Sequence, residues 1–471
     1  MSDQPKSPKE ARRLERVKQG SRAARDLGPP SPGARAAGAS PGARSQGPST
    51  RPAGSFGQMT KSAPRRPPPV LGSIGESTGT SGEPTVVVSR RAVERLDLGH
   101  VWVYRSDIAA PAGLAGGEVV RLADERGWFV GKAFYGAQSQ IAVRLLTRED
   151  EPVDDDFFAR RLAQAKALRD AIAPDPERRR AGRLVHGEAD LLPGLIVDRY
   201  ADCLSIQTLT EATDARRDLF AGLLQDLLQP RAIVERNDVR VRAHEGLPQR
   251  KGLLRGDPPG AVEFLEGEVR LVADLLEGQK TGAFLDQAEN RVEAGRHARG
   301  RALDCFTYGG AFALQLARRA ESVTAVDISE QAAAQGREAA ARNGAQNLEF
   351  KVANAFDLLS DEAERGERYD TIVLDPPAFA KSKASLDAAL RGYKEINLRA
   401  FLMLNRGGVL ITCSCSFHLD DLQFESVVLA AATDARRNVQ VIERRGAGRD
   451  HPTLLGVPET RYLKCLILRV L

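Results

Sequence analysis

Two short motifs in the second half of the chain combine residue types that can do chemistry. The first runs from Asp375 to Phe379 and follows the apolar run 369–374, which predicts a buried strand. Ligands of open α/β sheets bind at the carboxyl ends of the strands. A carboxylate at that place can accept the ring-edge N–H groups of a flat heterocycle, and an aromatic ring can stack on its face. We therefore predict a clamp for a nucleobase, in which Pro376, Pro377 and Phe379 contact the base.

The second motif places two thiols, Cys413 and Cys415, in the run 407–416, which ends another predicted strand near the same edge of the sheet. A thiol on a strand is more often a small core residue than a nucleophile, but the flanking threonine and serines indicate a polar setting. C5 of a pyrimidine is a poor nucleophile, and a thiolate that adds to C6 makes C5 an enamine-like carbanion that can attack a sulfonium methyl group. The two motifs predict covalent chemistry on a nucleobase, and the residues alone leave both cysteines open as the nucleophile.

Candidate cofactor residues follow three further predicted strands, 301–306, 322–327 and 348–352. Glycines between the first strand and its helix let the backbone approach a ligand. Asp327 ends the second strand, where a carboxylate can accept both ribose hydroxyls, and Asn354 follows the third, where it can flank an adenine. The G-x-G-x-x-G pattern of dinucleotide-binding proteins is missing, which disfavours a nicotinamide cofactor. The set predicts S-adenosylmethionine, with these cofactor-binding residues: Asp304, Phe306, Tyr308, Gly310, Asp327, Asn354 and Asp375.

The segment 277–291, which precedes the first of these strands, has two interpretations. Its Lys280, Gln287 and Arg291 can meet the cofactor or an RNA phosphate, whereas the alternative is a solvated helix start with Asp286 near the cap. No metal site is expected, because the six histidines are dispersed and neither H-E-x-x-H nor C-x-x-C occurs.

Composition narrows the class of protein. The 471 residues suffice for two or three domains, and no run of about 18 uncharged apolar residues predicts a membrane span. The N-terminus lacks the apolar core of a secretory signal, and five scattered cysteines argue against a disulfide framework, so we expect a cytoplasmic protein with reduced thiols. Residues 1–84 carry 14 Lys and Arg against 6 Asp and Glu, so the rest of the chain is net −3 within a total of +5. RNA binding by that part must depend on local patches.

The elements that must position these residues follow a basic tail at 1–84, which is rich in Pro, Gly and Ser and which we expect to be disordered. Regularly spaced short strands predict a small β-barrel at 85–152. An amphipathic helix, 156–173, and a β-rich unit then make up a central α+β domain at 153–260. The strands expected in these two domains are 85–88, 101–104, 117–124, 127–135, 141–146, 194–199, 203–207 and 233–236, and a hairpin follows at 262–271.

The last domain, 261–471, alternates strands with helices, which indicates a doubly wound, Rossmann-like parallel sheet. The predicted fold class is therefore α/β, with a barrel and a β-rich domain in front of this sheet. The strands of the sheet are expected at 301–306, 322–327, 348–352, 369–374, 409–413, 439–443 and 461–470.

From about residue 85 to 471 the chain resembles the RlmI-type class I methyltransferases, which form 5-methylcytosine in 23S ribosomal RNA. The resemblance covers the family's N-terminal PUA domain, which is a small RNA-binding barrel, its central domain and its catalytic domain. Two features depart from the family: the tail, and Tyr308-Gly309-Gly310, where members often show Tyr-Thr-Gly. The segments that carry the resemblance are 99–104, 137–141, 188–198, 280–287, 304–310, 375–379, 414–416, 451–452 and 462–464.

The resemblance implies an S-adenosylmethionine-dependent methyltransferase that acts on ribosomal RNA, without a metal or a membrane, and it leaves a homodimer open. The family's cysteine lies in a Ser-Cys-Ser setting, which corresponds to Cys415, so the nucleophile is assigned to Cys415 and Cys413 is kept in reserve. Asp375 is the second expected catalytic residue, because it faces both the cofactor and the base. Lys280 and Arg291 are candidates for contact with the RNA.

Two other functions stay open at this point. Methylation of another base atom, such as guanine N7 or N2, needs no thiol. A non-catalytic RNA-binding factor for ribosome assembly could keep the same fold without binding S-adenosylmethionine.

Overall fold

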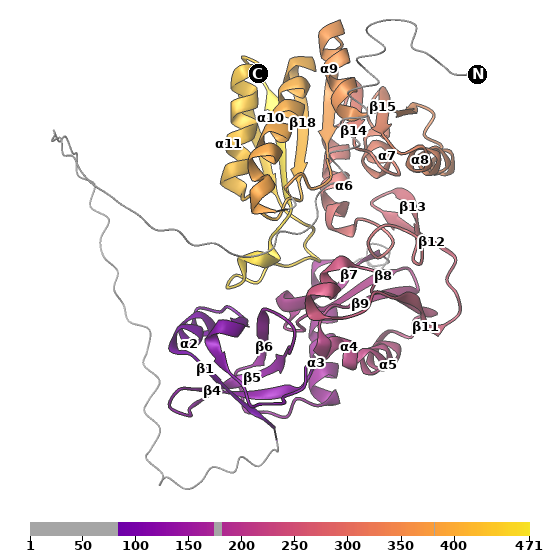
Figure 1. Ribbon diagram of the computed structural model, residues 1–471. Helices are drawn as coiled ribbons and strands as arrows, with labels where there is room; N and C mark the ends of the chain where they lie inside the picture. Colours follow the sequence, from indigo (N-terminus) through magenta and orange to yellow (C-terminus); the bar gives the residue numbers. More distant parts are fainter. Residues whose placement is uncertain (1–82, 174–180, 381) are drawn as a thin grey trace, which may run out of the picture. The chain divides into compact units, whose positions relative to one another are not determined.

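The computed structural model describes residues 83–173, 181–380 and 382–471 (Figure 1). The tail expected at 1–84 lies outside the described residues except for its last two positions. The described strands form sheets of six, five, two and seven strands. In this part of the chain, no helix combines the length and the apolar character that crossing a bilayer requires.

The six-stranded sheet is N-terminal and confirms the strands expected at 85–152. Its order is β2-β6-β5-β4-β1-β3, in which β1 is parallel to β4 and the other neighbours are antiparallel. Alternate residues such as Val86, Val88 and Leu122 point into a shared apolar core, to which helix α2 (Arg90–Asp97) contributes. The strands are β1 Thr85–Val88, β2 Trp102–Tyr104, β3 Ile108–Ala109, β4 Val119–Asp124, β5 Phe129–Tyr135 and β6 Ile141–Thr147.

The five-stranded sheet belongs to the central domain and has the order β11-β10-β9-β8-β7. Helix α3 (Asp155–Ile172) precedes it, as expected, and starts at Asp154, whose carboxylate accepts from the N–H of Phe157. Strands β8, β9 and β10 confirm the predictions, whereas β7 and β11 are additional, because their Arg-, Lys- and Gly-rich sequences hide the alternation of a strand. The elements are β7 Ala181–His186, β8 Leu195–Tyr200, β9 Cys203–Thr208, α4 Glu211–Ala215, α5 Arg217–Leu228, β10 Ala232–Arg236 and β11 Lys251–Gly256.

The two-stranded sheet is the expected hairpin, formed by β12 (Ala261–Glu266) and β13 (Val269–Asp274). Its buried Val262, Phe264 and Leu271 belong to one apolar cluster with residues of the central sheet and with residues of the C-terminal sheet and its helices. The hairpin therefore ties these two sheets together through a common core.

The seven-stranded sheet confirms the Rossmann-like domain, in the order β16-β15-β14-β17-β18-β20-β19. Strands β14 to β18 pair in parallel, but β20 runs antiparallel to both β18 and β19. The parallel pairing of the expected Rossmann-like sheet therefore holds for β14 to β18 and does not extend to β20. The residues between β19 and β20 form only a short 3₁₀ turn, Pro458–Thr460, and strands joined without a crossover helix pair antiparallel. The strands are β14 Arg301–Cys305, β15 Ser322–Asp327, β16 Leu348–Val352, β17 Tyr369–Leu374, β18 Leu404–Ser414, β19 Val439–Arg445 and β20 Lys464–Val470.

Helices cover both faces of this sheet (Figure 1). Ala302 and Val373 pack under one helical layer, and their strand neighbours Leu303 and Leu374 pack under the other. A parallel sheet buried on both faces needs such continuous apolar runs. The first layer consists of α6 Ala288–His297, α7 Ala311–Ala317 and α8 Glu330–Asn343, and the second of α9 Ala355–Arg365, α10 Leu386–Met403 and α11 Asp421–Asp434.

Candidate active site

The candidate residues gather at the edge where the parallel strands end. Asp375 directly follows β17, and Cys415 directly follows β18. Contacts join neighbouring strand ends: the N–H of Tyr308 donates to Asp327 at 2.8 Å, and the sulfur of Cys415 lies 4.0 Å from the carbonyl oxygen of Pro376. The topology thus brings together residues that are far apart in the sequence.

The loop after β14 is strained. Phe306 and Tyr308 have φ angles of +65° and +50°, which residues with a side chain disfavour, and Gly310 follows at +82°. Asp304 is fully buried and accepts from the hydroxyl of Thr307 at 2.5 Å, while its Oδ1 has no hydrogen-bond partner among the described residues. Burial raises the pKa of Asp304 to about 7. Strain of this kind persists only where the surrounding structure holds it, and it clusters at binding sites.

Asp327 and Asn354 use part of their hydrogen-bonding capacity within the fold. The two oxygens of Asp327 accept backbone N–H groups, from Tyr308 at 2.8 Å and from Ser329 at 2.9 Å. Asn354 caps helix α9, because its amide oxygen accepts from the N–H of Phe356 at 2.9 Å. A carboxylate has about four acceptor sites, so Asp327 can still accept two hydroxyl groups, and the amide of Asn354 can still donate.

Aromatic rings line the same edge. The ring centroids of Phe306 and Phe356 lie 6.1 Å apart, and that of Phe379 lies 6.5 Å from the first and 5.7 Å from the second. Phe379 also packs on Tyr393 at 4.7 Å. The three phenylalanines are partly exposed and Pro377 is exposed, so this cluster offers ring faces to a flat ligand.

Asp375 is partly exposed and precedes the buried Pro376. Its carboxylate accepts from the side-chain amide of Gln287 at 2.8 Å. Burial and the carboxylate of Asp286 raise the pKa of Asp375 to about 6, against the opposite effects of Arg291 and Gln287. A carboxyl group with a pKa this close to neutrality can hold or exchange a proton at a ligand.

The two candidate thiols have different surroundings. Cys413 is fully buried opposite Cys465 in the pairing of β18 with β20, and this neighbour together with burial raises the pKa of Cys413 well above the ordinary value. Cys415 is the one cysteine of the chain that is not fully buried. Burial raises the pKa of Cys415 as well, Asp375 adds to this effect, and Lys280 opposes it. Of the two cysteines, Cys415 is therefore the one that a ligand can approach.

A network that sequence patterns do not reveal holds the turn 414–416. The hydroxyl of Ser414 donates to the hydroxyl of Tyr393 on α10 at 2.9 Å, and the hydroxyl of Ser416 lies 3.0 Å from the same atom. The N–H of Ala380 donates to the hydroxyl of Ser416 at 3.1 Å, and Nζ of Lys464 on β20 donates to its carbonyl oxygen at 2.7 Å. Distant parts of the chain therefore fix the cysteine between two buried serines.

The two residues expected to contact RNA, Lys280 and Arg291, have different surroundings in the structure. Nζ of Lys280 donates to Asp286 at 2.7 Å and lies over the ring of Phe284, and the Lys280 side chain is 41% exposed. Arg291 is buried, where its guanidinium pairs with Glu266 and donates to the carbonyl oxygen of Phe284 at 2.9 Å. Lys280 thus lies close to the catalytic candidates, whereas the structure does not support the RNA contact expected for Arg291.

The edge of the sheet at which the parallel strands end has residues that suit S-adenosylmethionine. The acidic end of β15 can accept the ribose hydroxyls, and the partly exposed phenylalanines can hold the adenine ring. The strained loop adds an unpartnered oxygen of Asp304 and open space at Gly309, where an added Cβ would meet no atom within 4 Å. The expected cofactor residues converge here, and their individual contacts with the cofactor stay a prediction.

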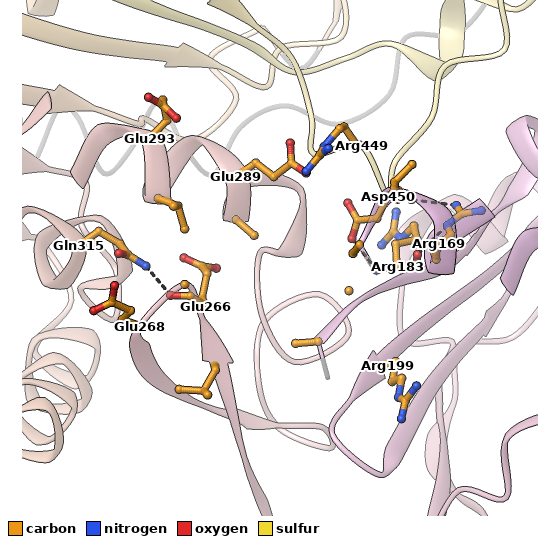
Figure 2. A pocket seen from close by; sticks show the side chains of 18 of the residues that line it. Arg169, Arg183, Arg199, Glu266, Glu268, Glu289, Glu293, Gln315, Arg449 and Asp450 are labelled. Carbon is orange, nitrogen blue, oxygen red and sulfur yellow. Dashed lines mark hydrogen bonds and ion pairs between the residues drawn. The ribbon is translucent and has the colours of Figure 1, made fainter. Parts of the chain in front are cut away.

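A cavity of about 600 Å³ lies elsewhere, between helix α3, strand β7, the hairpin and helix α6 (Figure 2). It contains none of the candidate catalytic residues. Charged side chains around it pair with one another, as Arg183 does with Asp198 and Glu289 with Arg449, each at 2.8 Å. Part of its wall flanks residues 174–180, which the structure does not describe. The strand edge, and not this cavity, is therefore the candidate site.

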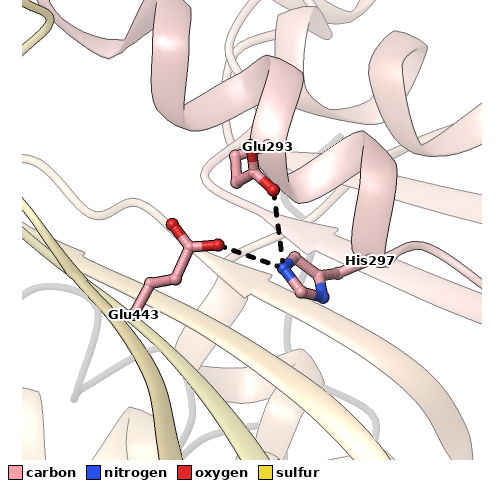
Figure 3. Close-up of side chains that lie close together, drawn as sticks. All are labelled: Glu293, His297 and Glu443. Carbon is pink, nitrogen blue, oxygen red and sulfur yellow. Dashed lines mark hydrogen bonds and ion pairs between the residues drawn. The ribbon is translucent and has the colours of Figure 1, made fainter.

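One described group, Glu293, His297 and Glu443, comes close to the geometry of a metal site (Figure 3). Nε2 of His297 lies 3.7 Å from Glu293 and 3.4 Å from Glu443. The second carboxylate oxygen of each glutamate pairs with an arginine, Arg296 or Arg445. These contacts account for the group as an ion-pair network that joins α6 to the edge strand β19.

Family models match two parts of the chain. Residues 86–148 match a PUA-like domain, and residues 296–446 match a methyltransferase domain. Both ranges lie inside the domains expected at 85–152 and 261–471.

Curated relatives match most of the chain. The ribosomal RNA large subunit methyltransferase I of Tolumonas auensis is 40% identical over 395 residues, which are 82% of this chain and 99% of that protein. The protein of the same name from Photobacterium profundum is 40% identical over 78% of this chain and 94% of its own length. The Vibrio cholerae protein is 37% identical over 82% of this chain and 100% of its own length.

Two solved structures share the fold. SMU.776, described as a methyltransferase complexed with SAH, aligns with a TM-score of 0.71 at 21% identity, over 82% of this chain and 100% of that one. A protein from Streptococcus mutans, described as a SAM-dependent methyltransferase, aligns with a TM-score of 0.69 at 21% identity and the same coverage. At this level of identity, the two structures are evidence for the fold alone.

Proposed function

Because the chain belongs to the ribosomal RNA large subunit methyltransferase I family, we propose that it methylates C5 of a cytosine in 23S ribosomal RNA, with Cys415 as a covalent nucleophile. Family membership makes the chain an S-adenosylmethionine-dependent rRNA methyltransferase. The target atom and the roles of single residues are the new part of the proposal. Bound S-adenosylmethionine supplies an electrophilic methyl group, and the remaining chemistry is assigned to residues of this chain.

Cys415 starts the reaction. Its thiolate adds to C6 of the cytosine, which opens the C5–C6 double bond and places an electron pair on C5. After C5 has taken the methyl group, a base removes the C5 proton, the double bond re-forms, and the sulfur leaves as a thiolate. The carboxylate of Asp375, held by Gln287, accepts from the exocyclic amino group of the cytosine and keeps the ring beside the sulfur.

The aromatic and proline residues after Asp375 complete the base pocket. Partly exposed Phe379 and exposed Pro377 offer surfaces on which the base can lie once it has left its stack. The PUA-like sheet and the central sheet grip the RNA through its shape and its phosphates. We take 85–152, 153–260 and 261–471 as the working domains and place the protein in the cytoplasm.

One observation carries this proposal: the two neighbouring thiols differ in accessibility. Cys415 is a partly exposed residue whose sulfur lies 4.0 Å from the carbonyl oxygen of Pro376, whereas Cys413 is fully buried in the core. A nucleophile must reach its target atom, so the first thiol fits the role and the second does not.

Substitution of each cysteine tests the proposal. We expect Cys415→Ala to abolish methylation and Cys413→Ala to retain it, read as resistance of cytosine to bisulfite in rRNA from cells that carry each variant. Calorimetry with S-adenosylmethionine is the control, and both variants should bind it like wild type. Transfer of labelled methyl groups to rRNA that survives in both variants, without any bisulfite-resistant cytosine, would favour another base atom. A reversed bisulfite result would move the nucleophile to Cys413. Failure of the wild type to bind the cofactor would favour a non-catalytic factor.

A further inference from the structure

The turn that carries Cys415 contacts a buried lysine that the reaction above does not use. Lys464 opens β20, lies opposite Ser414 in the pairing with β18, and is 4% exposed. Its Nζ donates to the carbonyl oxygens of Ser416 and Tyr462, both at 2.7 Å. An ammonium group has three N–H donors, so one of them remains after these two contacts.

The ammonium group of Lys464 is not within ion-pair distance of any carboxylate that the structure describes. Among residues 83–173, 181–380 and 382–471, no Asp or Glu makes an ion pair with it. The nearby acids are engaged elsewhere, since Asp420 caps α11 and Asp421 pairs with Arg461 at 2.8 Å. Burial lowers the pKa of Lys464 to about 8, while Asp421 and Cys415 act in the opposite direction. A buried ammonium group without a counter-charge is costly, so this site favours a negative charge close to it.

The thiol of Cys415, in contrast, is near carboxylates that disfavour its negatively charged form. Burial raises the pKa of this thiol most, and the carboxylates of Asp375 and Asp286 also oppose its ionisation. Lys280 favours ionisation, but its Nζ is bound to Asp286 at 2.7 Å, so that the two charges largely cancel. Lys464 is a second cation beside this turn: its Nζ bonds the residue after Cys415, and Cys415 raises the pKa of Lys464. Unlike Lys280, it makes no ion pair with a described carboxylate.

We propose that Lys464 is a positioning residue that supplies the counter-charge of the Cys415 thiolate: its ammonium group holds the turn through the carbonyl oxygen of Ser416 and favours the ionised sulfur. The inference rests on the proposed function only in taking Cys415 as the nucleophile. When the thiol ionises, its proton leaves to solvent and two buried opposite charges remain, which offsets part of the desolvation cost of each. The thiolate is the form that can add to C6.

Alkylation of Cys415 by iodoacetamide measures this effect without RNA or cofactor. The rate is followed over a pH series in the full-length protein, and the labelled peptide is quantified by mass spectrometry. The other four cysteines are buried, and Cys415→Ala gives their background. Lys464→Met and Lys464→Gln remove the charge, and the second keeps a donor for Ser416. Lys464→Arg keeps the charge.

A matched control removes a lysine that is remote from the sulfur. Lys394→Met serves this purpose, because Lys394 pairs with Asp434 at 2.7 Å on the surface. Circular dichroism and binding of S-adenosylmethionine identify the variants that fold. If Lys464→Met does not fold, Lys464→Gln decides the result.

We expect both neutral variants to raise the midpoint of the alkylation profile by about one pH unit, which lowers the rate at pH 7 about tenfold. Lys464→Arg and Lys394→Met should keep the wild-type midpoint. An unchanged midpoint in a folded neutral variant overturns the inference, as does a shift of equal size in Lys464→Arg, which would assign the effect to the shape of the turn. Because alkylation needs no RNA, its result is independent of whether Cys415 attacks cytosine, which the loss of methylation in Cys415→Ala tests separately.

Discussion

At the scale of single residues, the place where strand β18 ends decides which of two neighbouring cysteines is exposed. Their spacing in the sequence does not decide it. Cys413 and Cys415 are two positions apart, and on a continuous strand they would share one face. Strand β18 ends at Ser414, however, so Cys415 leaves the alternation and keeps its sulfur partly exposed. Where the strand ends depends on contacts of the turn, which a local sequence pattern does not contain.

The buried carboxyl group of Asp304 gives a prediction for the dependence of stability on pH. Its pKa is raised by burial to about 7 in the folded protein, whereas an aspartate in an unfolded chain ionises near about 3.9. The stability that this group contributes is therefore complete below the unfolded pKa and is lost as the pH rises through the folded pKa. Asp304→Asn removes this loss, so the variant should gain roughly 4 kcal/mol relative to wild type between pH 4 and pH 8.

Thermal unfolding at several pH values measures this gain as a difference in melting temperature. Asp375→Asn is the control, because burial raises the pKa of Asp375 to about 6, which predicts the same trend with a smaller amplitude. If the difference in melting temperature between wild type and Asp304→Asn did not change with pH, Asp304 would be ionised in the folded protein across this range, which would contradict the prediction.

At the scale of elements, the sequence predicts most of the sheet but not all of its pairing. Strands β15, β16 and β17 have the predicted bounds, because each shows the apolar or alternating pattern of a strand and ends at a polar residue or turn. Strands β7 and β11 escape prediction because charged residues interrupt their apolar pattern. The antiparallel direction of β20 could not be predicted either, because the residues of a strand indicate how buried it is but not which strand it pairs with.

The rule that ligands bind at the carboxyl ends of parallel strands locates the candidate site from sequence. It finds Asp327, Asp375 and Cys415, which the structure brings to one edge. It does not find Tyr393 or Lys464, because these come from α10 and β20 and act through tertiary contacts. No spacing in the sequence marks residues whose role is to hold a turn of another element.

Helix α10 gives a prediction at this scale. Tyr393→Phe removes the hydroxyl that bonds Ser414 and Ser416 but keeps the ring that packs on Phe379. We expect a stability loss of about 1–2 kcal/mol. We also expect methyl transfer to slow about tenfold, because the turn that aims the sulfur loosens. Denaturant unfolding and kcat measure the two effects.

The matched control is Tyr369→Phe, which removes another buried hydroxyl, bonded to Glu362 at 2.7 Å and located at the opposite end of β17 from Asp375. This variant should lose similar stability and keep its kcat. If both variants lost the same activity, the hydroxyl of Tyr393 would matter only for stability.

At the scale of the whole molecule, hydrogen bonds tie the central domain to the site. Thr281 donates to Asp198 of β8 at 2.6 Å, in the loop that also carries Lys280. Arg169 of α3 donates to the carbonyl oxygen of Asp450 at 2.8 Å. Since the chain beyond residue 84 is net −3, we expect its binding of RNA to depend on local basic patches.

A covalent bond between the sulfur of Cys415 and C6 of a cytosine is the central claim, and trapping that bond tests it most directly. Fluorine at C5 cannot leave as a proton does, so an rRNA fragment with 5-fluorocytosine at the target should stop the reaction with the sulfur still attached. We predict a protein–RNA complex that survives denaturation and maps to the peptide containing Cys415, with none in Cys415→Ala. Attachment to Cys413, or methylation of ordinary RNA by an enzyme that never traps the fluorinated substrate, would contradict this account.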